Sequence, residues 1–393
     1  MNTPLPQAPG PIGVFDSGYG GLTILHGIRQ LLPQYDYVFL GDNARAPYGP
    51  RSFDVVYEFT RQAVLKLFRM GCQLVILGCN TASAKALRTI QENDLPQWDP
   101  ARRVLGVIRP TVEVIGQLTR SGHVGLLATE GTVKSHSYDM EIKKLWPDLT
   151  ISGVACPFWV PLVEYNEADS PGADYFVKKR LDELMAKDPK IDAIILGCTH
   201  YPILLPKILK YTPRGVRIVP QGEYVASSLR EYFVRHPEIE QKCTRHASCR
   251  YLTTENADKF SDGARMFLHE NVNVEHIDLE EMQETRQNRI SRLLQKELSS
   301  IFQSQTRKMH GVLVSVTRVR ISPDLSICTA YLSIFPSDRG DEILRNINAS
   351  EKTIRYELGT RVRNQLRIIP ELRFFIDDSL DYLDHIDQLL KKG

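Results

Sequence analysis

Two short apolar runs in this chain each end in a cysteine. LVIL at 74–77 is followed by Gly-Cys-Asn-Thr, which places Cys79 after the run, and AIIL at 193–196 is followed by Gly-Cys-Thr-His, which places Cys198 there. Short runs rich in branched residues predict buried parallel strands, and ligands bind at the carboxyl ends of such strands. The start of a helix favours the thiolate form of a nearby cysteine. Two such thiols facing each other across a cleft would form a matched base and acid.

Further motifs surround the two cysteines in a fixed order. Together the set resembles the glutamate racemase family over residues 12 to about 279, and the segment 41–49 favours glutamate over aspartate. The motifs are IGVFDSGYGG at 12–21, GDNARAPYG at 41–49, GCNTA at 78–82, ACPFWVPLVE at 155–164 and LGCTHYP at 196–202.

The chemistry that this resemblance implies suits a pair of thiols. Inversion of an amino acid needs a base on one face of Cα and an acid on the other, and thiols can exchange these roles. We therefore expect Cys79 and Cys198 to be the catalytic pair, with no cofactor and no metal. By resemblance, Asp16 assists Cys79, His200 assists Cys198, and Glu164 is a further acid–base group.

The resemblance also implies a set of residues that hold the substrate. Their hydroxyl, amide and backbone groups would bind its carboxylates. They are Asp16, Ser17, Tyr48, Gly49, Asn80, Thr81, Thr199 and His200.

Several of these residues also have structural explanations. Asp16 could cap the following helix, His200 could be a hydrogen-bonded core residue, and Glu164 could act on a helix dipole. The cluster of Cys243, His246 and Cys249 lacks a clear fourth ligand and the spacing of a zinc site.

The part of the chain from Ile12 to about Leu279 alternates short strands with amphipathic helices, which predicts parallel sheets covered on both faces. The two equivalent cysteine motifs favour two similar α/β lobes. We expect lobe A at about 12–102 plus 212–279 and lobe B at about 103–211. Strands are predicted at 12–16, 36–41, 73–78, 103–107, 122–127, 149–154, 191–196, 216–220, 249–253 and 273–277, and helices at 22–31, 53–70, 82–93, 111–120, 133–145, 173–187, 203–211, 223–235 and 256–269.

Residues 283–393 follow a different pattern, namely a helix, two strands, two helices, a strand and a last helix. This order is that of a small α+β type II KH-like fold, and the motif YELGTRVRNQLRIIPEL at 356–372 resembles ribosome-binding factor A. The join contains Met282, which suggests the start of a formerly separate gene. The resemblance implies binding to rRNA of the small ribosomal subunit. Since Ile354, Leu358, Val362 and Leu366 form a core stripe, the RNA contacts are predicted at Arg355, Arg361, Arg363 and Arg367.

Composition agrees with a globular protein of two or three domains. The 393 residues carry a net charge of +2, and the basic excess lies after residue 282. Seven cysteines without disulfide-framework spacing suggest a reducing cytosol. The chain begins without a signal-peptide pattern, and no apolar run approaches ~18 residues, so we expect a cytoplasmic protein that does not enter the membrane.

The sequence therefore predicts a fusion of a cofactor-independent glutamate racemase, which would supply D-glutamate for peptidoglycan, with a ribosome-maturation module. A homodimer through the racemase region stays open. Two alternatives also remain, namely an aspartate racemase and an RNA-binding assembly factor that uses the racemase fold as a binding body.

Overall fold

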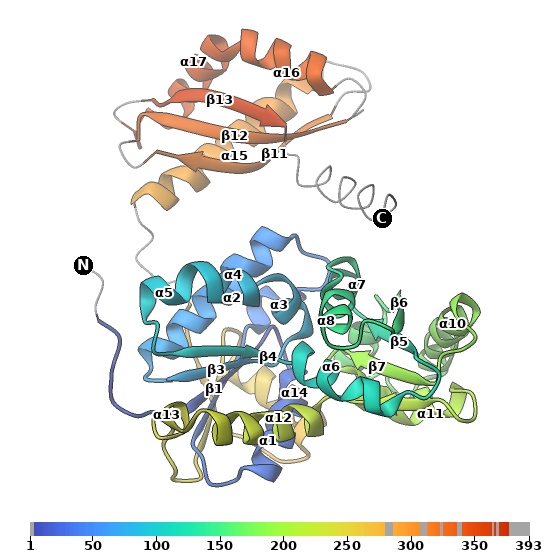
Figure 1. Cartoon of the computed structure of the whole chain (residues 1–393). Coiled ribbons are helices and arrows are strands. Elements are labelled where there is room, and N and C mark those ends of the chain that lie inside the picture. Colours follow the sequence, from blue (N-terminus) through green and yellow to red (C-terminus); the bar gives the residue numbers. More distant parts are fainter. Residues whose placement is uncertain are drawn as a thin grey trace. The chain divides into compact units, whose positions relative to one another are not determined.

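The computed structural model describes residues 4–279, 286–306, 313–322, 325–335, 340–363, 365–366 and 369–376. The chain forms two compact units, Met1–Leu279 and Glu280–Gly393 (Figure 1). Among the helices in the described ranges, none combines the length and apolar character needed to cross a bilayer.

Lobe A of the first unit is built on a six-stranded parallel sheet in the order β10-β9-β2-β1-β3-β4. Neighbouring residues of β1 point to opposite faces, so Val14 packs with helices α1, α12 and α14 while Phe15 packs with α2 and α3. Both faces of the sheet are thereby buried, as its continuous apolar strands predicted. The strands are β1 (Ile12–Asp16), β2 (Tyr37–Gly41), β3 (Leu74–Leu77), β4 (Arg103–Gly106), β9 (Cys249–Thr253) and β10 (Val274–His276), and the helices are α1 (Gly21–Leu31), α2 (Phe53–Arg69), α3 (Asn80–Lys85), α4 (Leu87–Thr89), α5 (Leu95–Trp98), α12 (Gly222–Arg235), α13 (Pro237–Glu240) and α14 (Ala257–Leu268).

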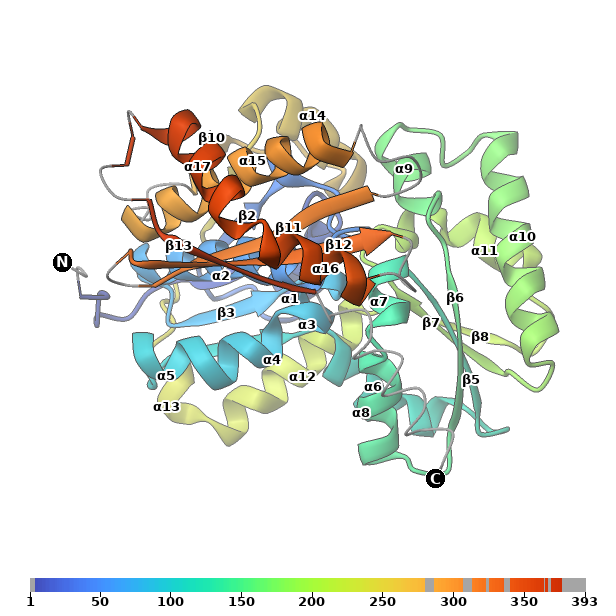
Figure 2. The same ribbon diagram turned by 90° about the horizontal axis from the view of Figure 1, so that it is seen from above.

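Lobe B has a four-stranded parallel sheet in the order β6-β5-β7-β8. Its helices α6 and α8 cover one face and α10 and α11 the other, as Figure 2 shows. The strands are β5 (His123–Ala128), β6 (Thr150–Ala155), β7 (Ala193–Gly197) and β8 (Arg217–Val219), and the helices are α6 (Ile108–Leu118), α7 (Glu130–Lys134), α8 (Ser137–Leu145), α9 (Trp159–Glu164), α10 (Pro171–Lys187) and α11 (Leu205–Tyr211).

The boundaries between the lobes differ from the predicted ones. β4 pairs with β3, so the segment from residue 103 belongs to lobe A, and β8 pairs with β7, so the chain stays in lobe B beyond residue 211. The chain therefore crosses between the lobes at Val107 and near Gln221. Both errors concern edge strands, whose apolar pattern does not reveal which sheet they join.

All ten predicted strands of the first unit are present, but two predicted helices are interrupted. The pattern at 133–145 is split into α7 and α8 by His136, which adopts a left-handed conformation with φ of 52°. The pattern at 82–93 is split into α3, α4 and a wider helical turn, Ile90–Asp94. The apolar periodicity runs across both interruptions, which is why it did not reveal them.

The second unit has the predicted order of elements over its described residues. Its sheet is β11-β12-β13, with β11 antiparallel and β13 parallel to β12. The core contains Leu294 and Leu298 of α15 and the predicted stripe residues Ile354 and Leu358 of α17. The elements are α15 (Arg286–Thr306), β11 (Leu313–Ile321), β12 (Ile327–Phe335), α16 (Gly340–Ala349), α17 (Glu351–Val362) and β13 (Glu371–Ile376). Met282, Arg367 and the predicted last helix lie outside the described residues.

Candidate active site

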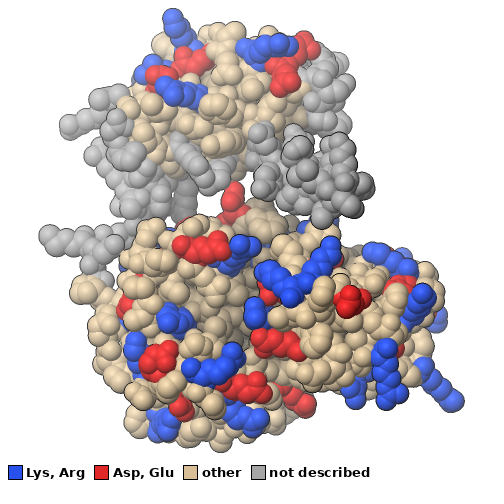
Figure 3. Space-filling view, in the orientation of Figure 1, with Lys and Arg blue, Asp and Glu red and all other residues tan. Residues whose placement is uncertain are grey.

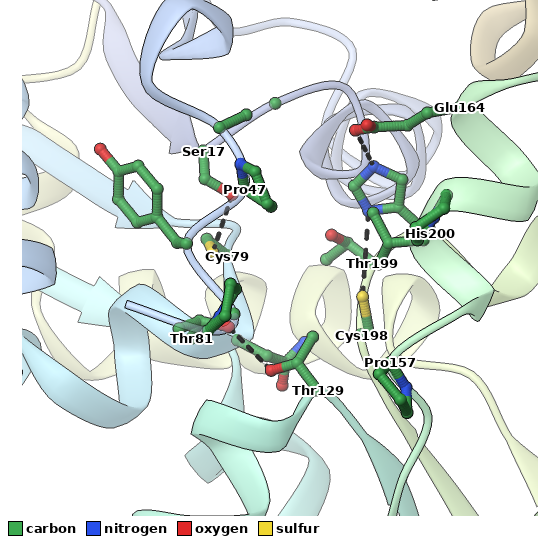
Figure 4. A pocket seen from close by; sticks show the side chains of 18 of the residues that line it. Ser17, Pro47, Cys79, Thr81, Thr129, Pro157, Glu164, Cys198, Thr199 and His200 are labelled. Atoms are coloured by element: carbon green, nitrogen blue, oxygen red, sulfur yellow. Dashed lines mark hydrogen bonds and ion pairs between the residues drawn. The ribbon is translucent and has the colours of Figure 1, made fainter. Parts of the chain in front are cut away.

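A cavity of about 280 Å³ in the first unit is lined by both lobes. Its walls come from segments that follow β1, β3, β5, β6 and β7, so the carboxyl ends of both sheets face it (Figure 4). Most of the predicted site residues line it. They are Ser17, Tyr48, Gly49, Cys79, Asn80, Thr81, Glu164, Cys198, Thr199 and His200.

Cys79 lies in the lobe A wall, at the position that caps helix α3. Its Sγ accepts a hydrogen bond from the backbone N–H of Ala82 at 3.4 Å and lies 3.4 Å from Ser17 Oγ. The thiol is buried, and this burial, together with the negative charge of Asp16, raises the pKa of Cys79 well above its usual range. Burial thus outweighs the start of α3, which was expected to favour the thiolate form of Cys79.

Cys198 lies in the lobe B wall, in the loop that follows β7. Its Sγ is 3.9 Å from Nδ1 of His200, and His200 Nε2 is 3.0 Å from Oε1 of Glu164 (Figure 4). Burial alone would lower the pKa of His200, but its hydrogen bonds to Cys198 and Glu164 raise that pKa to about 10. The imidazole of His200 therefore lies between the sulfur of Cys198 and the carboxylate of Glu164.

Asp16 ends β1, beside the strand β3 that precedes Cys79, as predicted. Its carboxylate accepts hydrogen bonds from the backbone N–H groups of Ser17, at 2.7 Å, and of Gly21 at the start of α1. It also accepts a 3.4 Å bond from Thr199 Oγ1 of lobe B. Ser17 contacts the sulfur of Cys79, and Asp16 is not among the described residues that line the cavity. These bonds give Asp16 a helix-capping role, and its acid–base role stays a prediction.

Two other predicted substrate-binding side chains are directed elsewhere. The hydroxyl of Tyr48 donates a 2.5 Å hydrogen bond to the buried Asp42, so Tyr48 offers the cavity its ring. The amide of Asn80 bonds to Gln221 and Tyr138, and Asn80 is only 2% exposed. Neither polar group is directed at a substrate in this arrangement.

The remaining predicted hydroxyl groups do lie at the cavity, together with residues that the sequence did not single out. Thr81 Oγ1 is 2.9 Å from Thr129 Oγ1, which joins α3 of lobe A to the start of α7 in lobe B. Thr129 follows β5, so its place at a strand's carboxyl end could have identified it. Pro47 and Pro157 also line the cavity (Figure 4), but nothing in their type indicated a site.

The arginines predicted to bind RNA fall on two sides of α17. Arg355 and Arg363 line a shallow groove on the second unit. Arg361 instead bonds to Glu357 at 2.8 Å and to Ser300 Oγ of α15 at 2.8 Å. Arg361 thus joins two helices of the same unit, and its predicted contact with RNA stays a prediction.

Comparison with known proteins agrees with this geometry. The family model Asp/Glu/Hydantoin racemase matches residues 21–227. The glutamate racemase of Ruegeria sp. is 38% identical over 274 residues, which cover 67% of this chain and 98% of the relative. The chain belongs to the glutamate racemase family. The relative from Streptococcus gordonii is 37% identical over 273 residues, with 68% and 98% covered.

Solved glutamate racemases share the fold of the racemase region. A glutamate racemase isoform from Bacillus anthracis gives a TM-score of 0.62 at 33% identity, covering 69% of this chain and 98% of that one. The glutamate racemase from Francisella tularensis in complex with D-glutamate gives 0.62 at 30% identity with the same coverage. A second family model, Ribosome-binding factor A, matches residues 286–390. The predicted fusion of a racemase region with a ribosome-binding factor A domain is confirmed.

Proposed function

We propose that the racemase region interconverts L-glutamate and D-glutamate with Cys79 and Cys198 as the two acid–base groups. The observation that carries this proposal is that equivalent cysteines, one from each lobe, open into one cavity. One thiolate removes the Cα proton, and the other thiol donates a proton to the opposite face. After one inversion the two cysteines have exchanged protonation states. The enzyme is then in the protonation state that the reverse reaction needs.

The surroundings of the two thiols differ. His200, held by Glu164, lies beside Cys198, whereas Ser17 lies beside Cys79, whose pKa is raised by burial and by the charge of Asp16. Cys198 acts as the base and Cys79 as the acid on the enantiomer whose Cα hydrogen faces Cys198, and the roles reverse for the other enantiomer. Ser17, Thr81 and Thr199 offer hydroxyl groups to the substrate.

Solvent isotope exchange tests this proposal on the full chain. In D₂O, racemisation should place deuterium at Cα of glutamate, with far slower incorporation into aspartate. Cys79→Ser and Cys198→Ser should each abolish inversion while leaving the thermal unfolding temperature within a few degrees of the native value. Inversion that survives in either variant would contradict the two-cysteine mechanism, and faster turnover of aspartate would contradict the choice of substrate.

The family resemblance also suggests where the enzyme works and how its product is used. We place the enzyme in the cytoplasm, where it would supply D-glutamate for peptidoglycan. The seven cysteines are all free thiols, which agrees with a reducing compartment. The visible face of the first unit intermixes positive and negative side chains (Figure 3), which gives no support to an RNA-binding role for that face. A homodimer through this unit stays a prediction that sedimentation equilibrium can check.

For the second unit we propose binding to rRNA of the small ribosomal subunit through the groove on α17. The groove has a volume of about 580 Å³, and the described residues that line it include no acidic one. The side chain of Tyr356 is 75% exposed. Cations suit phosphates, and an exposed aromatic ring can stack on an unpaired base. The lining residues are Lys352, Arg355, Tyr356, Gly359, Thr360, Arg363 and Ile369.

Contacts within the second unit shape the groove and hold one of its arginines in place. Gly359 leaves room for Ile369, since a Cβ at 359 would lie 3.3 Å from Ile369 Cγ1. Arg355 donates to the backbone oxygen of Ile369 at 2.7 Å, which holds its guanidinium at the rim. Sedimentation of the full chain with small subunits at low and high salt tests the proposal. Tyr356→Ala should weaken binding without changing its salt dependence, whereas equal binding by the variant would remove the stacking role.

A further inference from the structure

Three buried side chains beside the cavity form a closed ring of hydrogen bonds. Asn80 Nδ2 donates to Gln221 Oε1 at 2.6 Å, Gln221 Nε2 donates to the hydroxyl of Tyr138 at 2.8 Å, and that hydroxyl donates to Asn80 Oδ1 at 2.8 Å. Each member thus donates once and accepts once around the ring. The bonds in such a cycle reinforce one another, and the further bond from Gln221 Nε2 to the backbone oxygen of Val107 selects one of the two orientations that the amides could share.

The ring joins lobe A, lobe B and the connection between them. Asn80 is the first residue of α3 in lobe A and follows Cys79 directly. Tyr138 belongs to α8 in lobe B, and Gln221 lies where the chain returns from lobe B to lobe A. Gln221 Nε2 also reaches the backbone oxygen of Val107, at 3.2 Å, where the chain first enters lobe B.

The ring is too deeply buried to open without cost. Asn80 is 2% exposed, Gln221 3% and Tyr138 0%. A buried amide or hydroxyl that loses its partner finds no water to replace it. A change in the angle between the lobes must therefore move Asn80 together with Tyr138 and Gln221, and Asn80 carries the backbone that presents the neighbouring thiol.

We propose that the Asn80–Gln221–Tyr138 ring positions Cys79 for proton transfer by coupling the start of α3 to the connection between the lobes. The three are positioning residues, since their polar atoms bond to one another. The inference rests on the proposed two-cysteine mechanism. Among the described residues, the hydrogen-bond partner of Cys198 is His200, which Glu164 holds, and no hydrogen bond joins Cys198 to the ring.

Because the ring is coupled to Cys79 and not to Cys198, its loss should affect isotope exchange and inversion differently. When Cys79 is misplaced, the Cys198 thiolate can still break the Cα–H bond that faces it and form an S–H bond. Exchange of that thiol with D₂O and return of a deuteron to the same face of Cα leaves labelled substrate without inversion. Inversion needs a proton from Cys79 and fails. The ratio of exchange without inversion to inversion therefore measures the position of Cys79, and a general loss of folded enzyme lowers both rates equally.

The experiment compares the full chain with two ring variants in D₂O, starting from each enantiomer of glutamate. Tyr138→Phe removes only the hydroxyl, and Gln221→Met removes the amide at similar volume. Deuterium at Cα of the unconverted enantiomer is measured by mass spectrometry, and inversion by chiral chromatography. We expect at least a tenfold fall in inversion from both enantiomers, because the equilibrium constant of racemisation is 1. The exchange-to-inversion ratio should rise at least fivefold for one enantiomer only.

A matched control separates this effect from the loss of a buried tyrosine hydroxyl in general. Tyr37 is 1% exposed, and its hydroxyl donates to the backbone oxygen of Leu32 at 2.7 Å within lobe A. Tyr37→Phe should keep the native ratio. A native ratio in both ring variants, or an equal rise in Tyr37→Phe, overturns the proposal. Native enzyme that shows neither exchange nor inversion contradicts the two-cysteine mechanism instead.

Discussion

His200 Nε2 lies 3.0 Å from Oε1 of Glu164, although the two residues are 36 positions apart. Glu164 ends α9, and His200 lies in the loop after β7, so the contact exists only in the folded lobe. It leaves His200 Nδ1 directed toward Cys198. A carboxylate, an imidazole and a thiol thus lie in line at one wall of the cavity.

Replacing Glu164 by Gln should change how stability depends on pH. The hydrogen bonds to Cys198 and Glu164 raise the pKa of His200 to about 10, from an ordinary value of 6.5. Its protonation therefore stabilises the fold fully below pH 6.5, and this contribution is lost as the pH rises through 10. Glu164→Gln lowers the folded pKa, so the variant should lose less stability between pH 7 and pH 10. Thermal unfolding across this range measures the difference.

The same substitution should slow inversion, by about tenfold to a hundredfold, because His200 loses the partner that holds it beside Cys198. Glu167→Gln is a matched control, since Glu167 is exposed three residues further along. Identical pH–stability curves for the native enzyme and Glu164→Gln would show that the ion pair does not hold the proton on His200.

Replacing Ser17 by Ala should make Cys79 a weaker acid. The hydrogen bond with Ser17 lowers the pKa of the Cys79 thiol against the larger effects of burial and of Asp16, which raise it. Without the hydroxyl, the thiolate fraction at a given pH falls, and alkylation of Cys79 should slow by about threefold to tenfold. Mass spectrometry of the alkylated peptide measures this rate.

Ser52→Ala serves as the control for that experiment. Ser52 caps α2 by accepting from the backbone N–H of Val55 at 3.5 Å, so its loss costs stability of ~1 kcal/mol without reaching the cavity. If Ser52→Ala slows the alkylation of Cys79 as much as Ser17→Ala does, the effect comes from stability and not from the local hydrogen bond.

The sequence predicted the strands and the two cysteines of the cavity well because both depend on local signals. An apolar run followed by Gly-Cys marks a strand end in any α/β fold, and this placed Cys79 and Cys198 correctly at the cavity. The motif order added the residues around them. These inferences needed no knowledge of which strands are neighbours.

The remaining features depend on contacts between distant segments. Asn80 lies beside Cys79 in sequence, but its partners are 58 and 141 positions away, and no local pattern indicates them. The positions of β4 and β8 are likewise set by sheet pairing and not by their composition. The sequence pattern does not distinguish Arg361 from the other arginines of this segment, because its partner Ser300 belongs to a different helix, α15.

Arg361 and Arg363 should therefore respond differently to replacement by alanine. Arg363 lines the groove, so Arg363→Ala should reduce the slope of log affinity for small subunits against log salt by about 1. Arg361→Ala should leave that slope unchanged and lower the stability of the second unit by about 0.5–1 kcal/mol, through loss of the bonds to Glu357 and Ser300. Equal slopes for the two variants would remove the distinction drawn from the structure.

Asp16→Asn decides between a capping role and an acid–base role for Asp16. The carboxylate accepts from the backbone N–H groups of Ser17 and Gly21, and its charge raises the pKa of Cys79. Neutralising it should lower the pKa of Cys79 and speed alkylation of that thiol, the opposite of Ser17→Ala, while weaker capping costs ~1 kcal/mol or more of stability.

The control for this variant is Asp192→Asn. Asp192 also accepts backbone N–H bonds, from Arg120 at 2.7 Å and Ser121 at 2.8 Å, but it lies at the opposite ends of the lobe B strands from Cys198. Both variants should lose stability, and only Asp16→Asn should change the reactivity of Cys79. If Asp16 instead relays protons to Cys79, Asp16→Asn should slow inversion by about a hundredfold or more even as the thiol becomes more reactive. Because a cap predicts faster alkylation with modest loss of turnover, the two measurements together distinguish the roles.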